Sequence, residues 1–106
     1  MKTEKIVREE LKEIRHYYAN KKDFERVALT IGKPIALKMV ERYETHIKKA
    51  PIKLFNLYVC LYVNNNSQET VSTDWACSTG HIKVLNKRLY EFFIKEFNKE
   101  EKSYDV

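Results

Sequence analysis

Glycine and proline are nearly missing from this chain, and their scarcity limits the possible folds more than any other feature of the sequence. Only two glycines and two prolines occur in 106 residues. Sheet proteins built from repeated tight turns use many more of both residues. Charged residues make up 33% of the chain, which suits helices with one solvated face. The composition therefore predicts an all-α protein, and the length is that of a single domain.

Apolar residues recur at helical spacing through the first half of the chain. A first helix is expected over residues 3–20, with Thr3 as its N-cap. Asp23 is a candidate N-cap for a short second helix, which Gly32 is suited to end. A third helix is expected over residues 34–49, because proline fits a first helical turn.

The second half restarts at Pro51 and contains one ambiguous apolar segment. The stretch VCLYV has the residue types of a β-strand. We assign it to a helix over residues 51–63, because no second strand lies nearby to pair with it. We expect a single domain of 1–106, a small helical bundle in which residues 1–50 form a helical support, residues 51–97 contain a helix-turn-helix and residues 98–106 form a frayed tail.

Residues 67–97 have the spacing of two helices joined by a short turn. Ser67 is expected to cap the first helix, and Val71 and Trp75 point inward at i, i+4. The turn is Ala76-Cys77-Ser78, in which Ser78 caps the second, long helix. The predicted inner face of this long helix consists of Ile82, Leu85, Leu89 and either Phe92 or Phe93.

The outer face of the long helix is basic over its first turns. No acidic residue occurs between Ala76 and Tyr90, and that local imbalance is more informative than the formal net charge of +5. Lysine and arginine neutralise phosphates, and short polar residues near a helix start reach base edges in the major groove. The predicted DNA-contacting residues are Ser78, Thr79, Gly80, His81, Lys83, Val84, Lys87 and Arg88, with Lys53 as a further contact to the DNA backbone.

The segment NNNSQETVSTDWACSTGHIKVLNKRL resembles the helix-turn-helix of sigma factor region four and of related small phage and bacterial regulators. The matching positions are Ser67-Gln68-Glu69, Val71, Trp75, Cys77, Ser78 and Ile82. Two positions depart from the family pattern. Ser72 replaces an alanine at the helix crossing, and its hydroxyl can bond to the carbonyl four residues earlier. Ala76 replaces the turn glycine, which costs about 1 kcal/mol if the turn needs a left-handed residue.

The resemblance implies a DNA-binding transcriptional regulator, of the kind encoded by phages or prophages, with double-stranded DNA and RNA polymerase as partners. A homodimer would read two half-sites. Tyr17, Tyr18 and Tyr43 could form its interface, although packing inside the monomer explains them more simply. One alternative is a protein-interaction module that uses Val84 and the region of Tyr90 and Phe93. Another is the DNA-recognition subunit of a phage packaging machine.

Catalysis, metal binding and membrane insertion lack sequence signals. His16, His46 and His81 are far apart, without a paired nucleophile or carboxylate, and each is expected at the surface. Cys60 and Cys77 have no histidine at zinc-ligand spacing and are expected to be buried thiols. No apolar stretch is long enough to cross a bilayer, and the N-terminal segment lacks an apolar signal core. We therefore expect a cytoplasmic protein without a cofactor and without enzymatic activity.

Overall fold

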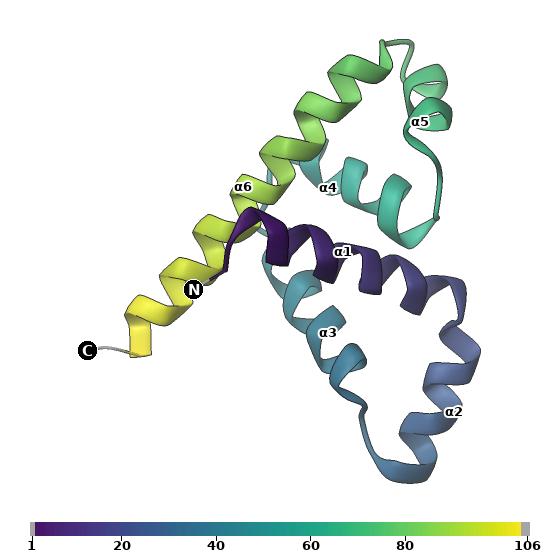
Figure 1. Ribbon diagram of the computed structural model, residues 1–106, viewed down its shortest axis with the longest axis vertical. Helices are drawn as coiled ribbons and strands as arrows, with labels where there is room; N and C mark the ends of the chain where they lie inside the picture. The colour runs from purple at the N-terminus through teal and green to yellow at the C-terminus, as the bar shows by residue number, and fades with distance from the viewer. Residues whose placement is uncertain (1, 105–106) are drawn as a thin grey trace.

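Helices make up almost the whole structure, a computed structural model that describes the backbone of residues 2–104 and the side chains of residues 2–101. No strand occurs among residues 2–104, so the all-α prediction is confirmed. α1 crosses the long α6, and α2 lies at the lower right of Figure 1, away from the start of α6. The elements in this part of the chain are α1 (Glu4–Ala19), α2 (Lys21–Ile31), α3 (Ile35–Ile47), α4 (Ile52–Tyr58), the π-helical turn η1 (Val59–Val63), α5 (Gln68–Asp74) and α6 (Thr79–Tyr104).

α1 begins and packs as its sequence predicts. The Thr3 side chain accepts a hydrogen bond from the backbone N–H of Ile6, which satisfies one of the free donors of the first turn. Its buried residues are Val7, Leu11, Ile14 and Tyr17, whereas Tyr18 is half-buried. This buried face packs against η1, α3 and α6.

One residue, Asn20, both ends α1 and begins α2. Its backbone N–H donates to the carbonyls of His16 and Tyr17, while its own carbonyl accepts from Asp23 and Phe24. The prediction of Asp23 as the N-cap is therefore wrong: Asp23 lies inside the first turn of α2. A carboxylate there still faces the positive end of the helix dipole, which explains the misleading signal.

Gly32 ends α2, as predicted, and the connection to α3 runs through Pro34. Gly32 has φ of +88°, a backbone conformation that residues with a Cβ atom rarely adopt. Pro34 is the N-cap of α3 and lies just outside the helix, not within its first turn. α2 buries none of its residues, and α3 buries Val40, Tyr43, His46 and Ile47.

The ambiguous stretch VCLYV is helical, as the lack of a pairing strand predicted. It forms the π-helical turn η1, in which the N–H of Asn64 donates to the carbonyl of Val59 at 2.8 Å. Leu61 and Tyr62 of this turn are buried. Because η1 packs against both α1 and α5, it connects the N-terminal helices to α5.

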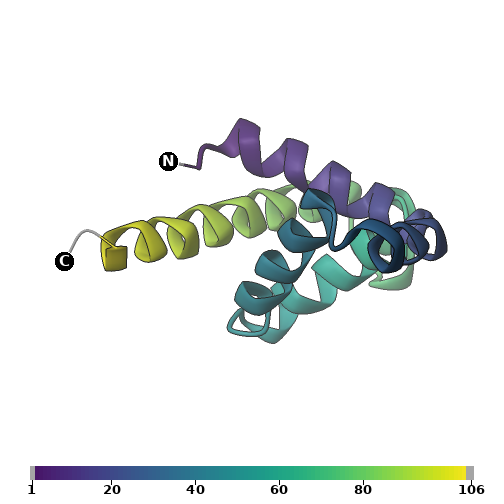
Figure 2. The same cartoon turned by 90° about the horizontal axis from the view of Figure 1, so that it is seen from below.

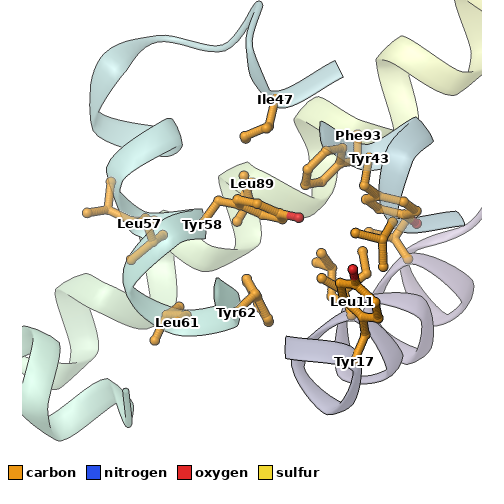
Figure 3. Close-up of a cluster of buried hydrophobic side chains, with 14 of the residues drawn as sticks. Leu11, Tyr17, Tyr43, Ile47, Leu57, Tyr58, Leu61, Tyr62, Leu89 and Phe93 are labelled. Carbon is orange, nitrogen blue, oxygen red and sulfur yellow. The ribbon is translucent and has the colours of Figure 1, made fainter. Parts of the chain in front are cut away.

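Aromatic side chains form the centre of the core (Figure 3). The Tyr43 ring centroid lies 4.7 Å from that of Phe93 and 4.9 Å from that of Phe97. Tyr43 is 0% exposed and Tyr17 is 5% exposed. Packing inside the chain therefore accounts for both tyrosines, and neither can supply the dimer interface that the sequence left open.

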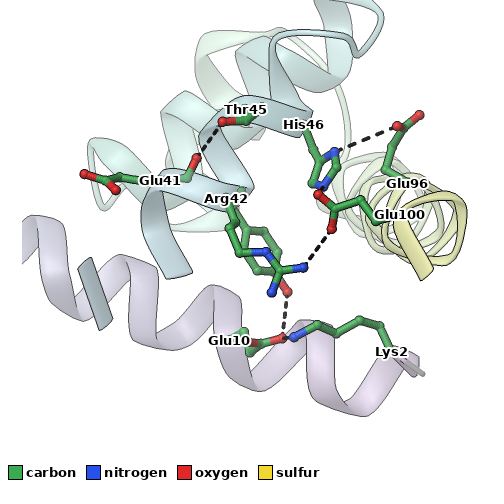
Figure 4. Close-up of polar contacts among 9 residues, drawn as sticks. Lys2, Glu10, Glu41, Arg42, Thr45, His46, Glu96 and Glu100 are labelled. Carbon is green, nitrogen blue, oxygen red and sulfur yellow. Dashed lines mark hydrogen bonds and ion pairs between the residues drawn. The ribbon is translucent and has the colours of Figure 1, made fainter. Parts of the chain in front are cut away.

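The C-terminal part of α6 is a packed helix. α6 continues past the expected end near Phe97 to Tyr104, so the segment expected to fray is helical up to that residue; residues 105 and 106 lie outside the described residues. Arg42 of α3 donates to Glu100 of α6 at 2.7 Å (Figure 4). His46 was expected at the surface but is 3% exposed, because α3 turns its imidazole toward Glu96 and Glu100.

Candidate nucleic-acid interface

Ser67 starts the first helix of the motif through its side chain. The backbone N–H of Thr70 donates to Ser67 Oγ at 3.1 Å, as the sequence predicted. Val71 and Ser72 are the buried residues of α5, whereas Trp75 is half-buried at its end. The Ser72 hydroxyl donates to the carbonyl of Glu69 at 2.7 Å, three residues earlier and not the four that we expected. This bond satisfies the buried hydroxyl of Ser72.

The turn between α5 and α6 is closed by two backbone hydrogen bonds. The N–H of Cys77 donates to the carbonyl of Ser72 at 3.0 Å, and that of Ala76 donates to the carbonyl of Thr73 at 3.2 Å. This pair of bonds is the Schellman pattern, which requires a left-handed residue just after the helix. Ala76 occupies that position with φ of +53°. An alanine therefore adopts the left-handed conformation that glycine usually supplies in this kind of turn.

Ser78 is the N-cap of α6, and the predicted inner face of α6 packs against the core. The backbone N–H of His81 donates to Ser78 Oγ at 3.1 Å. Phe93, not the half-buried Phe92, belongs to the inner face. The fully buried positions of this face are Ile82, Leu85, Leu89 and Phe93.

The predicted DNA-contacting residues of α6 share one end of that helix and are open to solvent. Thr79 is half-buried, while Ser78, Gly80, His81, Lys83, Val84, Lys87 and Arg88 are exposed. At 3.6 residues per turn, Lys83 and Lys87 lie along one flank, and His81 and Arg88 lie two turns apart along the other. A Cβ at Gly80 would meet only Ser78 Oγ, at 3.8 Å, so the fold itself does not require glycine there.

Lys53 stands apart from this group. It is exposed in the first turn of α4, a helix that packs against α6. Lys53 does not line the groove that contains Lys83 and Lys87, whose other lining residues come from α1, α5 and α6 itself.

Three polar side chains form a buried hydrogen-bonded network next to Lys83 and Lys87, which the sequence analysis did not predict. The Tyr62 hydroxyl donates to Asn86 Oδ1 at 2.6 Å, and Asn86 Nδ2 donates to the Tyr90 hydroxyl at 2.7 Å. Burial raises the pKa of Tyr62 far above its usual value, so this hydroxyl keeps its proton. Asn86 is 6% exposed. Its place next to Leu85, on the predicted inner face, was the only feature of the sequence that could have indicated a buried asparagine. The network fixes the rotation of α6 against η1.

Other kinds of site find no support in the described residues. Among the side chains of residues 2–101, no three histidine, cysteine or acidic groups are placed so that they could hold a metal ion. Cys60 and Cys77 are free thiols, but both are half-buried and not buried as expected. In the same part of the chain, none of the helices has the length and apolar character required to span a membrane.

Comparison with known proteins finds no matching family model, no matching curated protein and no matching solved structure.

Proposed function

We propose that this chain is a DNA-binding regulator of transcription that inserts the N-terminal part of α6 into the major groove. The observation that carries the proposal is the exposed basic surface of α6, formed by Lys83, Lys87 and Arg88 on a helix whose first acidic residue is Glu91. A short helix and a tight turn precede this surface, which is the arrangement that presents a recognition helix to DNA.

The small side chains at the start of α6 support the same proposal. Ser78, Thr79 and Gly80 have small side chains or none, so that base edges can approach the backbone of the first turn of α6 closely. Val84, 50% exposed on the outer face, can contact a thymine methyl group. The buried inner face and the Tyr62–Asn86 hydrogen bond hold this end of α6 rigidly, which reduces the entropic cost of binding.

The test is duplex binding by the full chain at several salt concentrations, compared with a double variant. Lys83→Ala with Lys87→Ala should weaken binding and reduce the steepness of the salt dependence, because each lost phosphate contact removes about 0.9 from the logarithmic slope. Lys21→Ala with Lys22→Ala removes the same charge from exposed positions of α2 and should leave both quantities unchanged. Equal affinities for the two double variants would rule out α6 as the recognition helix.

Selection of bound duplexes from a random pool separates a regulator from a packaging subunit. A regulator should recover a defined sequence, and a palindrome would indicate a two-fold dimer. Recovery of unrelated sequences with the same salt dependence would instead favour the packaging role.

A protein-interaction module is the second candidate function, and the exposed apolar residues at the α2–α3 corner favour it. Leu29, Ile31 and Ile35 are 90%, 78% and 87% exposed. Phe93, one of the contacts considered from the sequence, is fully buried and cannot serve. Absence of salt-dependent duplex binding by the wild-type chain would favour this candidate over the regulator.

A further inference from the structure

A shallow groove joins the basic flank of α6 to the start of α1. Lys83 and Lys87 form one wall, and Arg8 approaches from α1, far away in the sequence. The first residue of α5, Gln68, lies between them. The complete lining is Glu4, Arg8, Gln68, Lys83, Asn86, Lys87 and Tyr90. Three cationic side chains therefore converge on a groove that contains one carboxylate.

Arg8 is held in place on two sides. Its Nη2 donates to Glu4 Oε1 at 3.1 Å, and its guanidinium carbon lies 5.7 Å from the centroid of the Tyr90 ring. The Tyr90 hydroxyl accepts the bond from Asn86, so the ring itself belongs to the buried network. The Arg8 side chain is 54% exposed. A guanidinium has several further N–H donors, so Arg8 can receive a second acceptor without leaving Glu4.

The chemistry of the lining fits a phosphate group. Arg8 can donate two parallel hydrogen bonds to phosphate oxygens, whereas Lys83 and Lys87 act as compact charges. The Gln68 amide adds an uncharged donor. The Glu4 carboxylate orients Arg8 but opposes an anion, so it should lower the affinity of the groove for phosphate.

We infer that this groove holds a phosphate of the DNA strand that runs along the α1 side of the recognition helix, with Arg8 as its bidentate donor. The inference rests on the proposed function and extends the DNA-contacting surface to α1. A helix with mixed charges thereby contributes one positioned cation to the interface.

The test compares opposite substitutions in the full chain. Arg8→Ala should weaken duplex binding several-fold and lower the logarithmic salt slope by about 0.9, the value for one phosphate contact. Glu4→Gln should do the reverse and strengthen binding, because it removes a negative charge beside the phosphate. A damaged fold cannot produce that opposite sign. The matched controls are Arg26→Ala and Glu25→Gln, exposed positions of α2 that should leave affinity and slope unchanged.

Each outcome decides the inference. If Arg8→Ala behaves like Arg26→Ala while the Lys83/Lys87 double variant still weakens binding, the groove inference is overturned and the proposed function stands. If Glu4→Gln does not strengthen binding relative to Glu25→Gln, the Glu4 carboxylate does not oppose the bound DNA and the inference is again overturned. If the wild-type chain shows no salt-dependent duplex binding, both proposals are wrong.

Discussion

Ala76 places an ordinary side chain in a backbone conformation that favours glycine. Its φ of +53° lies in the left-handed region, where an L-residue is about 1–2 kcal/mol less stable. Glycine removes that strain but adds about 0.5–1 kcal/mol of entropy to the unfolded chain. Ala76→Gly should therefore raise the free energy of unfolding by about 0.5–1 kcal/mol, measured by urea denaturation.

The same substitution inside a right-handed helix provides the control for Ala76. Ala28 lies within α2, and Ala28→Gly should lower the free energy of unfolding by about 0.5–1 kcal/mol. Equal destabilisation by the two substitutions would show that the turn does not strain Ala76.

At the scale of elements, α2 contributes little to the core although five of its eleven residues are apolar. Leu29 is 90% exposed, whereas Leu11 of α1 is 0% exposed. Leu29→Ala should change the free energy of unfolding by less than about 0.5 kcal/mol, and Leu11→Ala should lower it by about 2–5 kcal/mol. Urea denaturation of both variants measures the difference. A loss above about 1 kcal/mol for Leu29→Ala would mean that the Leu29 side chain makes packing contacts despite its exposure.

The starts and ends of helices were predictable where the cause is local. Thr3 and Ser67 accept bonds from N–H groups three residues away, and Gly32 has the positive φ that its residue type suggests. The extension of α6 past Phe97 was not predictable, because Arg42, the partner of Glu100, lies on another helix. Local spacing carries no information on such contacts.

The same distinction applies to the candidate interface. The exposed residues of α6 followed from the period of its buried face, since a helix that buries Ile82 and Leu85 must expose Lys83 and Lys87. Arg8 gives no such signal, because its neighbours on the helix, Lys5, Glu9 and Lys12, mix basic and acidic charge. Only the crossing of α1 over α6 brings Arg8 into the groove, and no sequence periodicity encodes that crossing.

At the scale of the whole molecule, polar side chains of α3 hydrogen-bond and pair with acidic side chains in the C-terminal part of α6. The molecule extends 43 × 39 × 22 Å, and Figure 2 shows its flat form from the edge. Glu100 accepts from Arg42 at 2.7 Å, and its Oε1 lies 3.1 Å from His46 Nε2. Burial raises the pKa of Glu100, but the hydrogen bond from Arg42 and the charges of His46 and Arg42 outweigh burial, so the pKa is lowered from its usual 4.5.

This lowered pKa makes the stability of the fold depend on pH. The folded chain binds the Glu100 proton less readily than the unfolded chain does, so the contribution is present above the unfolded pKa and is lost as pH falls through the lowered one. Glu100→Gln should be less stable near neutral pH and should lose less stability between about pH 6 and pH 3. Urea denaturation across this range measures both effects. Glu13→Gln, at an exposed position of α1, is the control for the loss of one carboxylate. Parallel profiles for Glu100→Gln and the wild-type chain would mean that the contact between α3 and α6 does not stabilise the ionised carboxylate.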